Sequence, residues 1–131
     1  MHAPQTQIAD QQVRHRLFTR LWHWINALAL AILLMSGLMI FNAHPRLYWG
    51  EYGSREDAAW LEINDTRTTG FLQIGTKRIE TTGVLGLSLG EDDRVRRVAF
   101  PGWATIPTDY SLAAARRWHF AFAWIFAIGL T

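Results

Sequence analysis

The stretch from Leu21 to Phe41 constrains this chain most, because its 21 residues include no Asp, Glu, Lys or Arg. At 1.5 Å per residue, a helix of this length spans about 30 Å, the thickness of a bilayer's hydrocarbon core. Trp22 and Trp24 stand at its start, where aromatic side chains gather at a membrane surface. A chain of 131 residues is too short to surround such a helix with a soluble core. We therefore predict a transmembrane helix over residues 21–42.

A second apolar segment, SLAAARRWHFAFAWIFAIGLT, begins at Ser111. Ser111 is a suitable N-cap, because its hydroxyl can accept a hydrogen bond from the first turn of a helix. Only 14 residues follow the pair Arg116 and Arg117, about 21 Å of helix, which is short of a full crossing. We expect residues 112–131 to be the start of a second transmembrane helix that ends inside the membrane, as in a fragment of a longer chain.

The segment between these helices, residues 43–111, has a different composition. It contains glycine-marked turns and short β-prone runs such as FLQIG, TTGVLGLSL and RVRRVAF. We interpret it as a long extramembrane loop with one or two hairpins. The expected fold class is therefore an all-α membrane protein. It would be a transmembrane helical bundle, with its first two helices present and the second truncated, and a long β-leaning loop.

The basic flank before the first helix sets the expected orientation. It contains Arg14, Arg16 and Arg20. Lysine and arginine beside a span favour the cytoplasmic side, whereas a loop as long as 43–111 does not count. We expect a cytoplasmic basic tail over residues 1–20, a periplasmic loop over 43–111, and a multi-pass protein of the bacterial inner membrane. Arg116 and Arg117 then lie on the outer side, which is consistent if they bind an anionic group there.

Composition excludes several classes of site. Without cysteine there is no disulfide, no thiolate metal site, no iron–sulfur cluster and no haem attached through CxxCH. No basic cluster is interleaved with aromatic residues in a polar setting, so nucleic acid is not an expected partner. The 43–111 loop offers no nucleophile–base spacing for a catalytic site of its own.

Two histidines stand near the starts of the apolar segments in matched settings, RLWHW around His23 and RRWHF around His119. Ionisable side chains inside a span are rare and usually functional. For either histidine alone, an interfacial side chain bonded to a neighbour or to water is the plainer interpretation. Imidazole is a good axial ligand for haem iron, and Arg20, Arg116 and Arg117 are suited to neutralise haem propionates. The repeated setting favours haem ligation by both histidines.

These two histidines cannot ligate one iron. Antiparallel helices that each begin with a histidine place the two side chains roughly 20 Å apart in depth. Two axial ligands of one iron lie within about 4 Å of each other. We therefore expect two haems, each taking its second ligand from helices outside this chain. His44 is a weaker candidate for a ligand or near neighbour of the outer haem, and His15 and His2 are interpreted as surface and tail residues.

The two ends of the chain resemble the bacterial cytochrome b561 and nickel–iron hydrogenase b-type cytochrome family. The resemblance rests on RLFTRLWHWINALALAILLMSGLMIFNAHPRLYWG and on PGWATIP followed by RRWHFAFAW, and the middle adds nothing to it. It implies a helical bundle with two b haems. His23 would ligate the haem on the cytoplasmic side and His119 the haem at the other face, with partner ligands from later helices that this chain lacks.

The expected function is that of a membrane-embedded electron-transfer subunit of an oxidoreductase complex, not a complete enzyme. Two haem b groups would carry electrons between the quinone or quinol pool and a periplasmic or membrane redox partner protein. The alternative is a cofactor-free anchor or assembly subunit whose periplasmic loop binds a partner. The lipid bilayer and the C-terminal helices that complete the bundle are the other expected partners.

Overall fold

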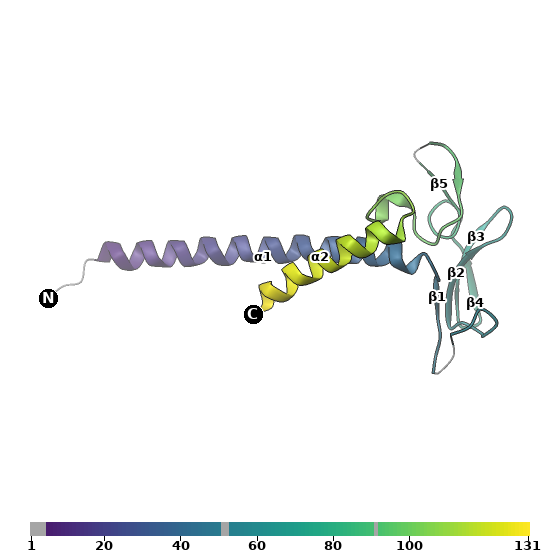
Figure 1. The fold of residues 1–131 in the computed structure, drawn as a ribbon, viewed down its shortest axis with the longest axis horizontal. Helices are drawn as coiled ribbons and strands as arrows, with labels where there is room; N and C mark the ends of the chain where they lie inside the picture. The colour runs from purple at the N-terminus through teal and green to yellow at the C-terminus, as the bar shows by residue number, and fades with distance from the viewer. Residues whose placement is uncertain (1–4, 51–52, 91) are drawn as a thin grey trace.

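The computed structural model describes residues 5–50, 53–90 and 92–131, with side chains from Arg16 onward. In this part of the chain, helix α1 runs over Gln5–Phe41 and helix α2 over Leu112–Leu130. Between them lies a group of antiparallel strands at one end of α1, which we call the cap (residues 43–111). Helix α2 returns along the half of α1 that is nearer the cap, so the two helices are antiparallel (Figure 1).

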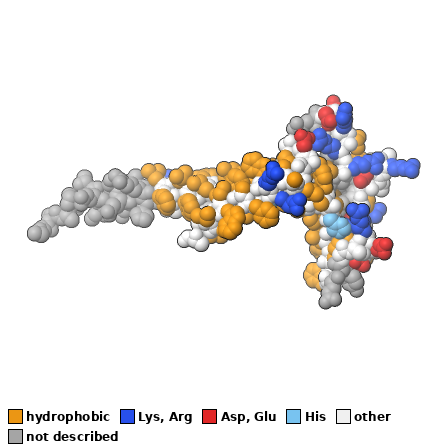
Figure 2. Space-filling view, viewed as in Figure 1, with side chains coloured by type: hydrophobic (Ala, Val, Ile, Leu, Met, Phe, Trp, Pro, Cys, Tyr) orange, Lys and Arg blue, Asp and Glu red, His pale blue; other side chains and the backbone are white. Residues whose placement is uncertain are grey.

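Helix α1 is rich in Ala, Leu and Ile and has no proline, which favours a continuous helix. Its part Arg16–Phe41 is the one described helical segment long and apolar enough to cross a membrane. Only 17% of the most apolar window of this segment is buried within the chain. Figure 2 shows hydrophobic side chains covering the described part of the helices, with charged side chains gathered at the cap. Such a surface is suited to contact lipid or further helices rather than water.

Helix α2 begins where the sequence predicts. Oγ of Ser111 accepts a hydrogen bond from the backbone N–H of Ala114 at 3.3 Å, which confirms the predicted N-cap. Ala115, in the first turn, is fully buried.

Two contacts set the register of α2 against α1. Near the cap, Oγ of Ser36 lies 3.0 Å from Nδ1 of His119. The second contact is ten residues farther from the cap on each helix, between Asn26 of α1 and Gly129 of α2. A Cβ added to Gly129 would overlap the Asn26 side chain. Here the indole N–H of Trp22 donates to the Gly129 carbonyl at 2.7 Å. A glycine at this point lets the helix backbones approach closely.

The cap is built on a four-stranded antiparallel sheet in the order β1-β2-β3-β4. These strands are β1 Arg46–Leu47, β2 Leu61–Asp65, β3 Gly70–Ile74 and β4 Lys77–Glu80. A second sheet pairs β5 Ser88–Leu89 with β6 Val95–Arg96. The short 3-10 helix Gly102–Ala104 then leads towards α2.

The expected all-α fold class is wrong, because residues 43–111 build two sheets. The β-prone runs do form strands, as the sequence predicts. FLQIG supplies most of β3 in the four-stranded sheet, and TTGVLGLSL and RVRRVAF contain β5 and β6 of the second sheet. Ile63 on β2 and Phe71 on β3 are both buried, on opposite faces of the four-stranded sheet, because Ile63 pairs with Leu72 and Phe71 pairs with Asn64. Three or more strands with apolar side chains to bury are stable where an isolated hairpin is marginal. The described chain is therefore a helix pair with antiparallel sheets, and only one of its helices meets the criteria for a membrane span.

Polar contacts join the cap to the end of α1. Asn42, directly after the helix, accepts a hydrogen bond from the Phe100 N–H at 2.8 Å and donates to the Phe100 carbonyl at 3.3 Å. The N–H of Ile106 donates to the carbonyl of Met35, inside α1, at 3.2 Å. Because Asn42 is only 9% exposed, these bonds are shielded from water and hold the cap against the helix pair.

Candidate functional site

His119 lies on the side of α2 that faces α1. Its Nδ1 is 3.0 Å from Oγ of Ser36, a side chain that is completely buried. A Cβ added to Gly37 would lie 3.6 Å from Cε1 of His119, so the Nδ1–Cε1 edge of the imidazole packs on α1. Within the described structure nothing forms a hydrogen bond to the other ring nitrogen, Nε2. That nitrogen is therefore available as a metal ligand.

His23 is held differently. Its side chain is exposed on α1. The ring meets Trp24 edge-on, with 5.8 Å between ring centroids and an interplanar angle of 69°. No residue of the described ranges forms a hydrogen bond to this imidazole. Both of its nitrogens are thus open to a group that approaches the part of α1 not covered by α2.

The structure keeps the two histidines apart. His119 is level with Ser36, and thirteen residues of α1 separate Ser36 from His23, which is about 20 Å of helix. Because axial ligands of one iron lie within about 4 Å of each other, these two side chains cannot share a metal. This agrees with the depth argument from the sequence.

The arginines expected to bind anionic groups are all exposed: Arg20, Arg116 and Arg117. None of them forms an ion pair with an acidic side chain of the described residues. Arg20 precedes His23 by three residues, and Arg116 precedes His119 by three. Residues three apart lie on the same face of a helix, so each histidine has a cation about one turn away.

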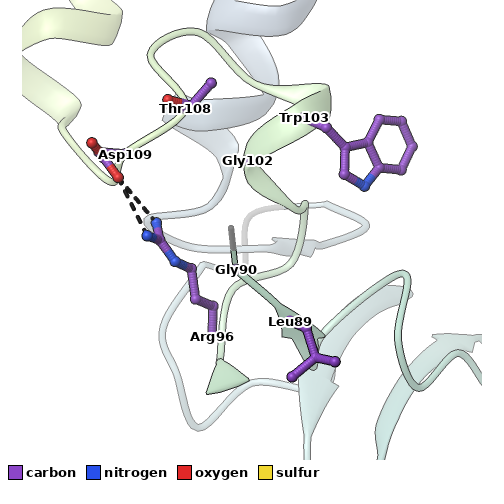
Figure 3. A pocket seen from close by; sticks show the side chains of 7 residues that line it. All are labelled: Leu89, Gly90, Arg96, Gly102, Trp103, Thr108 and Asp109. Carbon is purple, nitrogen blue, oxygen red and sulfur yellow. Dashed lines mark hydrogen bonds and ion pairs between the residues drawn. The ribbon is translucent and has the colours of Figure 1, made fainter. Parts of the chain in front are cut away.

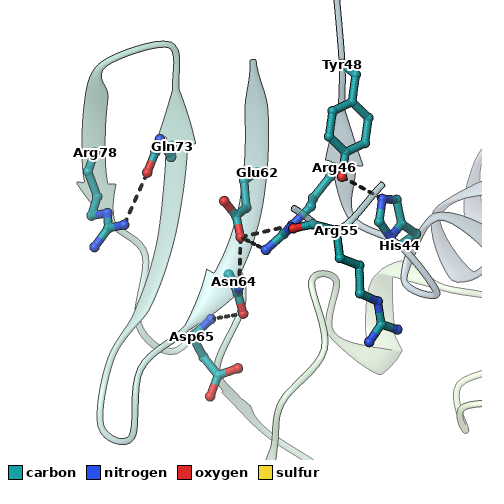
Figure 4. A network of polar contacts seen from close by, with 9 residues as sticks. All are labelled: His44, Arg46, Tyr48, Arg55, Glu62, Asn64, Asp65, Gln73 and Arg78. Carbon is teal, nitrogen blue, oxygen red and sulfur yellow. Dashed lines mark hydrogen bonds and ion pairs between the residues drawn. The ribbon is translucent and has the colours of Figure 1, made fainter. Parts of the chain in front are cut away.

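His44 belongs to a polar network in the cap (Figure 4). Its Nε2 lies 2.9 Å from the hydroxyl of Tyr48, and the two rings stack at 5.7 Å. Nearby, Arg46 forms a 2.7 Å ion pair with Glu62. The neighbouring Tyr48 hydroxyl, together with the Glu62 carboxylate, raises the pKa of Arg46 against the opposing effect of burial. Tyr48 thus gives the His44 ring a polar partner, and a metal is not needed to account for its position.

The cap also carries a shallow pocket beside β5, β6 and the 3-10 helix (Figure 3). Arg96 crosses it to form an ion pair with Asp109 at 3.3 Å. Its volume of about 60 Å³ would hold roughly two water molecules, so it is too small for a haem. Across the residues that the structure describes, no three His, Cys, Asp or Glu side chains gather as a metal site. Single histidines on the helices therefore remain the candidate ligands.

Comparison with protein families assigns the chain to a class. The family model for prokaryotic cytochrome b561 matches residues 14–131, nearly the whole sequence. The chain belongs to the prokaryotic cytochrome b561 family. As a cytochrome b561, it is a membrane protein with a b-type haem and a role in electron transfer. Membership of this family implies quinones and redox proteins in general as its partners. No curated protein and no solved structure matches the chain.

The side chains of this cytochrome b561 chain fit a b-type haem. Such a haem is held by axial side-chain ligands, and imidazole is the commonest of them. His119 has one ring nitrogen bonded to Ser36 and the other without a partner in the described structure, which is the state required of a ligand. Arg116 on the same face of α2 is suited to a propionate carboxylate.

Sequence reasoning missed the partner of His119. The signal available was a hydroxyl, Ser36, in an otherwise apolar span, and such a group needs a hydrogen-bond partner inside a membrane. The sequence does not say which residue of α2 lies level with it. The close approach of Gly129 to Trp22 and Asn26 depends on the same register and was missed for the same reason.

Proposed function

We propose that this chain supplies one ligand to each of two b haems and takes part in electron transfer between the quinone pool and a partner redox protein. The observation that carries the proposal is the helix register, in which His119 beside Ser36 lies about 20 Å along α1 from His23. Two histidines at this separation support one haem each. When bound, each haem supplies a one-electron couple at its own depth in the membrane.

In this proposal the chain's own side chains bind and orient the two groups. His23 and His119 would each provide one imidazole to a haem iron, and further helices of the proposed bundle would provide the other ligands. Arg20 binds the propionates on the His23 side, and Arg116 and Arg117 bind those on the His119 side. Their exposure, and their lack of acidic partners among the described residues, support this role. His44 is not among the proposed ligands, because Tyr48 already bonds to its Nε2.

The proposed setting is the bacterial inner membrane, with a cytoplasmic N-terminus and several spans. The arginines that precede the span support this orientation. The cap then faces the periplasm, on the side of the His119 haem, where a redox partner can dock. Membership of a b-type haem family disfavours the cofactor-free anchor, since an anchor has no use for a haem.

Reduced-minus-oxidised spectra of the full-length protein in membranes test the proposal. We expect His23→Ala and His119→Ala each to remove about half of the b-type absorbance, since each removes one ligand of a different haem, and the double variant to remove all of it. His44→Ala is the matched control and is expected to keep both haems. Unchanged spectra in both single variants, with protein levels equal by immunoblot, would rule out the proposed ligands.

A further inference from the structure

The contact between Ser36 and His119 determines where the proton of the imidazole lies. Oγ of Ser36 is 3.0 Å from Nδ1 of His119, and it also lies 2.7 Å from the carbonyl of Ile32 and 3.2 Å from the carbonyl of Leu33 in the preceding turn of α1. A serine hydroxyl has one proton to donate, whereas its oxygen can accept further bonds. The single hydroxyl proton therefore cannot serve both the backbone carbonyls and His119.

The carbonyl of Ile32 has no proton, so the 2.7 Å contact requires Ser36 to donate there. This is the usual bond of a serine inside a helix, and 2.7 Å is the ideal length for an O–H donor. Oγ of Ser36 must then accept from His119. We infer that His119 carries its proton on Nδ1, and that Ser36 is a positioning residue that presents the unprotonated Nε2 of His119 to the haem iron.

The packing of the ring agrees with this role. The Nδ1–Cε1 edge lies against Ser36 and Gly37, so Nδ1 is the ring nitrogen that meets the serine. Ser36 is fully buried, so water does not compete for the Nδ1 proton. The hydrogen bond thus fixes both the tautomer and the orientation of the ring.

A second consequence concerns the electronic strength of the ligand. An imidazole that donates its remaining N–H to an acceptor is the more basic ligand. A more basic axial ligand favours ferric over ferrous iron and lowers the reduction potential. Because His23 has no hydrogen-bond partner within the described ranges, the effect belongs to the His119 haem. This inference rests on the proposed function, since it requires that His119 ligate a haem.

Redox titration of the full-length protein in membranes tests the inference with Ser36→Ala. We expect the potential of one b haem to rise, with its redox equilibrium moving roughly threefold to tenfold towards the ferrous form, up to about 59 mV for one electron. The potential of the second haem is expected to stay unchanged and acts as an internal reference. Ser88→Ala is the matched control, because Ser88 is also buried but lies in the cap, and both potentials are expected to stay unchanged.

Two unchanged potentials in Ser36→Ala would overturn the inference and reduce Ser36 to a packing residue. If Ser36→Ala loses one haem, Ser36→Thr decides, because threonine keeps the hydroxyl and can bond to the same carbonyl. Recovery of the haem by threonine supports the inference, and loss in both variants overturns it. Failure of the proposed function is recognised separately, because His119→Ala would then keep both haems.

Discussion

The two histidines of this cytochrome b561 chain are supported unequally by their own helices. His119 rests against a buried hydroxyl on the neighbouring helix, whereas His23 is exposed and meets only Trp24. In the proposed di-haem arrangement, the chain therefore orients one ligand by itself, and the further helices of the proposed bundle would orient the other. Variants near His119 should act mainly on ligand geometry, and variants near His23 mainly on packing with those further helices.

At the end of the helix pair that is farther from the cap, Trp22→Phe tests the hydrogen bond between the indole N–H and the Gly129 carbonyl. We expect a loss of about 0.6 to 1.5 kcal/mol in the free energy of unfolding, the range for one hydrogen bond between helices. Unfolding of the full-length protein in detergent by added SDS would measure it. Trp124→Phe makes the same chemical change at a position that is 71% exposed and should have little effect. Equal losses in the two variants would contradict the role given to this bond.

The site residues show how far single positions can be predicted. His23 and His119 are recognisable because the same order of arginine, tryptophan and histidine occurs twice. Ser36 has no comparable signal, because its importance depends on which residue of α2 lies opposite. That choice is made by close packing at Gly129 and at the cap, between residues distant in sequence.

At the scale of elements, the junction between α1 and the cap depends on one side chain. Asn42→Ala removes both bonds to the backbone of Phe100 and leaves a shielded N–H and carbonyl without partners. We expect a cost of about 1 to 3 kcal/mol, concentrated in the segment that packs on the end of α1. Hydrogen exchange at the Phe100 amide should become faster, while exchange in β2 and β3 should change little.

Ala43→Ser, at the exposed neighbouring position, serves as the control for this junction. It alters the same turn without removing a bond to Phe100, so exchange at that amide should stay slow. Exchange that is equally fast in both variants would show that the turn itself, and not the Asn42 side chain, holds the cap.

The elements also differ in how predictable they are. The apolar span and the N-cap Ser111 follow from local rules and are found as expected. The β-prone runs are correct as strands, but only FLQIG belongs to the four-stranded sheet. That sheet also needs β1, β2 and β4, and the two-residue strand β1 has no periodicity to detect. The wrong all-α class followed from treating residues 43–111 as a loop with one or two hairpins, where the structure has a four-stranded and a two-stranded sheet.

At the scale of the whole molecule, the proposed orientation is testable because the native sequence has no cysteine. A single cysteine can therefore be introduced without background. We expect Ser54→Cys, exposed in the cap, to react with a membrane-impermeant maleimide in intact spheroplasts. Gln7→Cys, near the start of α1, should react only after the membrane is permeabilised. The opposite pattern would place the cap in the cytoplasm and move the proposed docking side with it.

The helix contacts Ser36–His119 and Asn26–Gly129 are ten residues apart on α1 and also ten residues apart on α2. The two helices must therefore keep equal lengths between these contacts. One inserted residue between the two contacts would turn a helix by about 100° and lengthen it by 1.5 Å, which breaks one contact or the other. The turn at residues 75–76, by contrast, joins β3 to β4 far from either helix contact. We therefore expect insertions and deletions to be tolerated in the cap. We expect them not to be tolerated in the ten-residue helix segments that set the depth of each histidine.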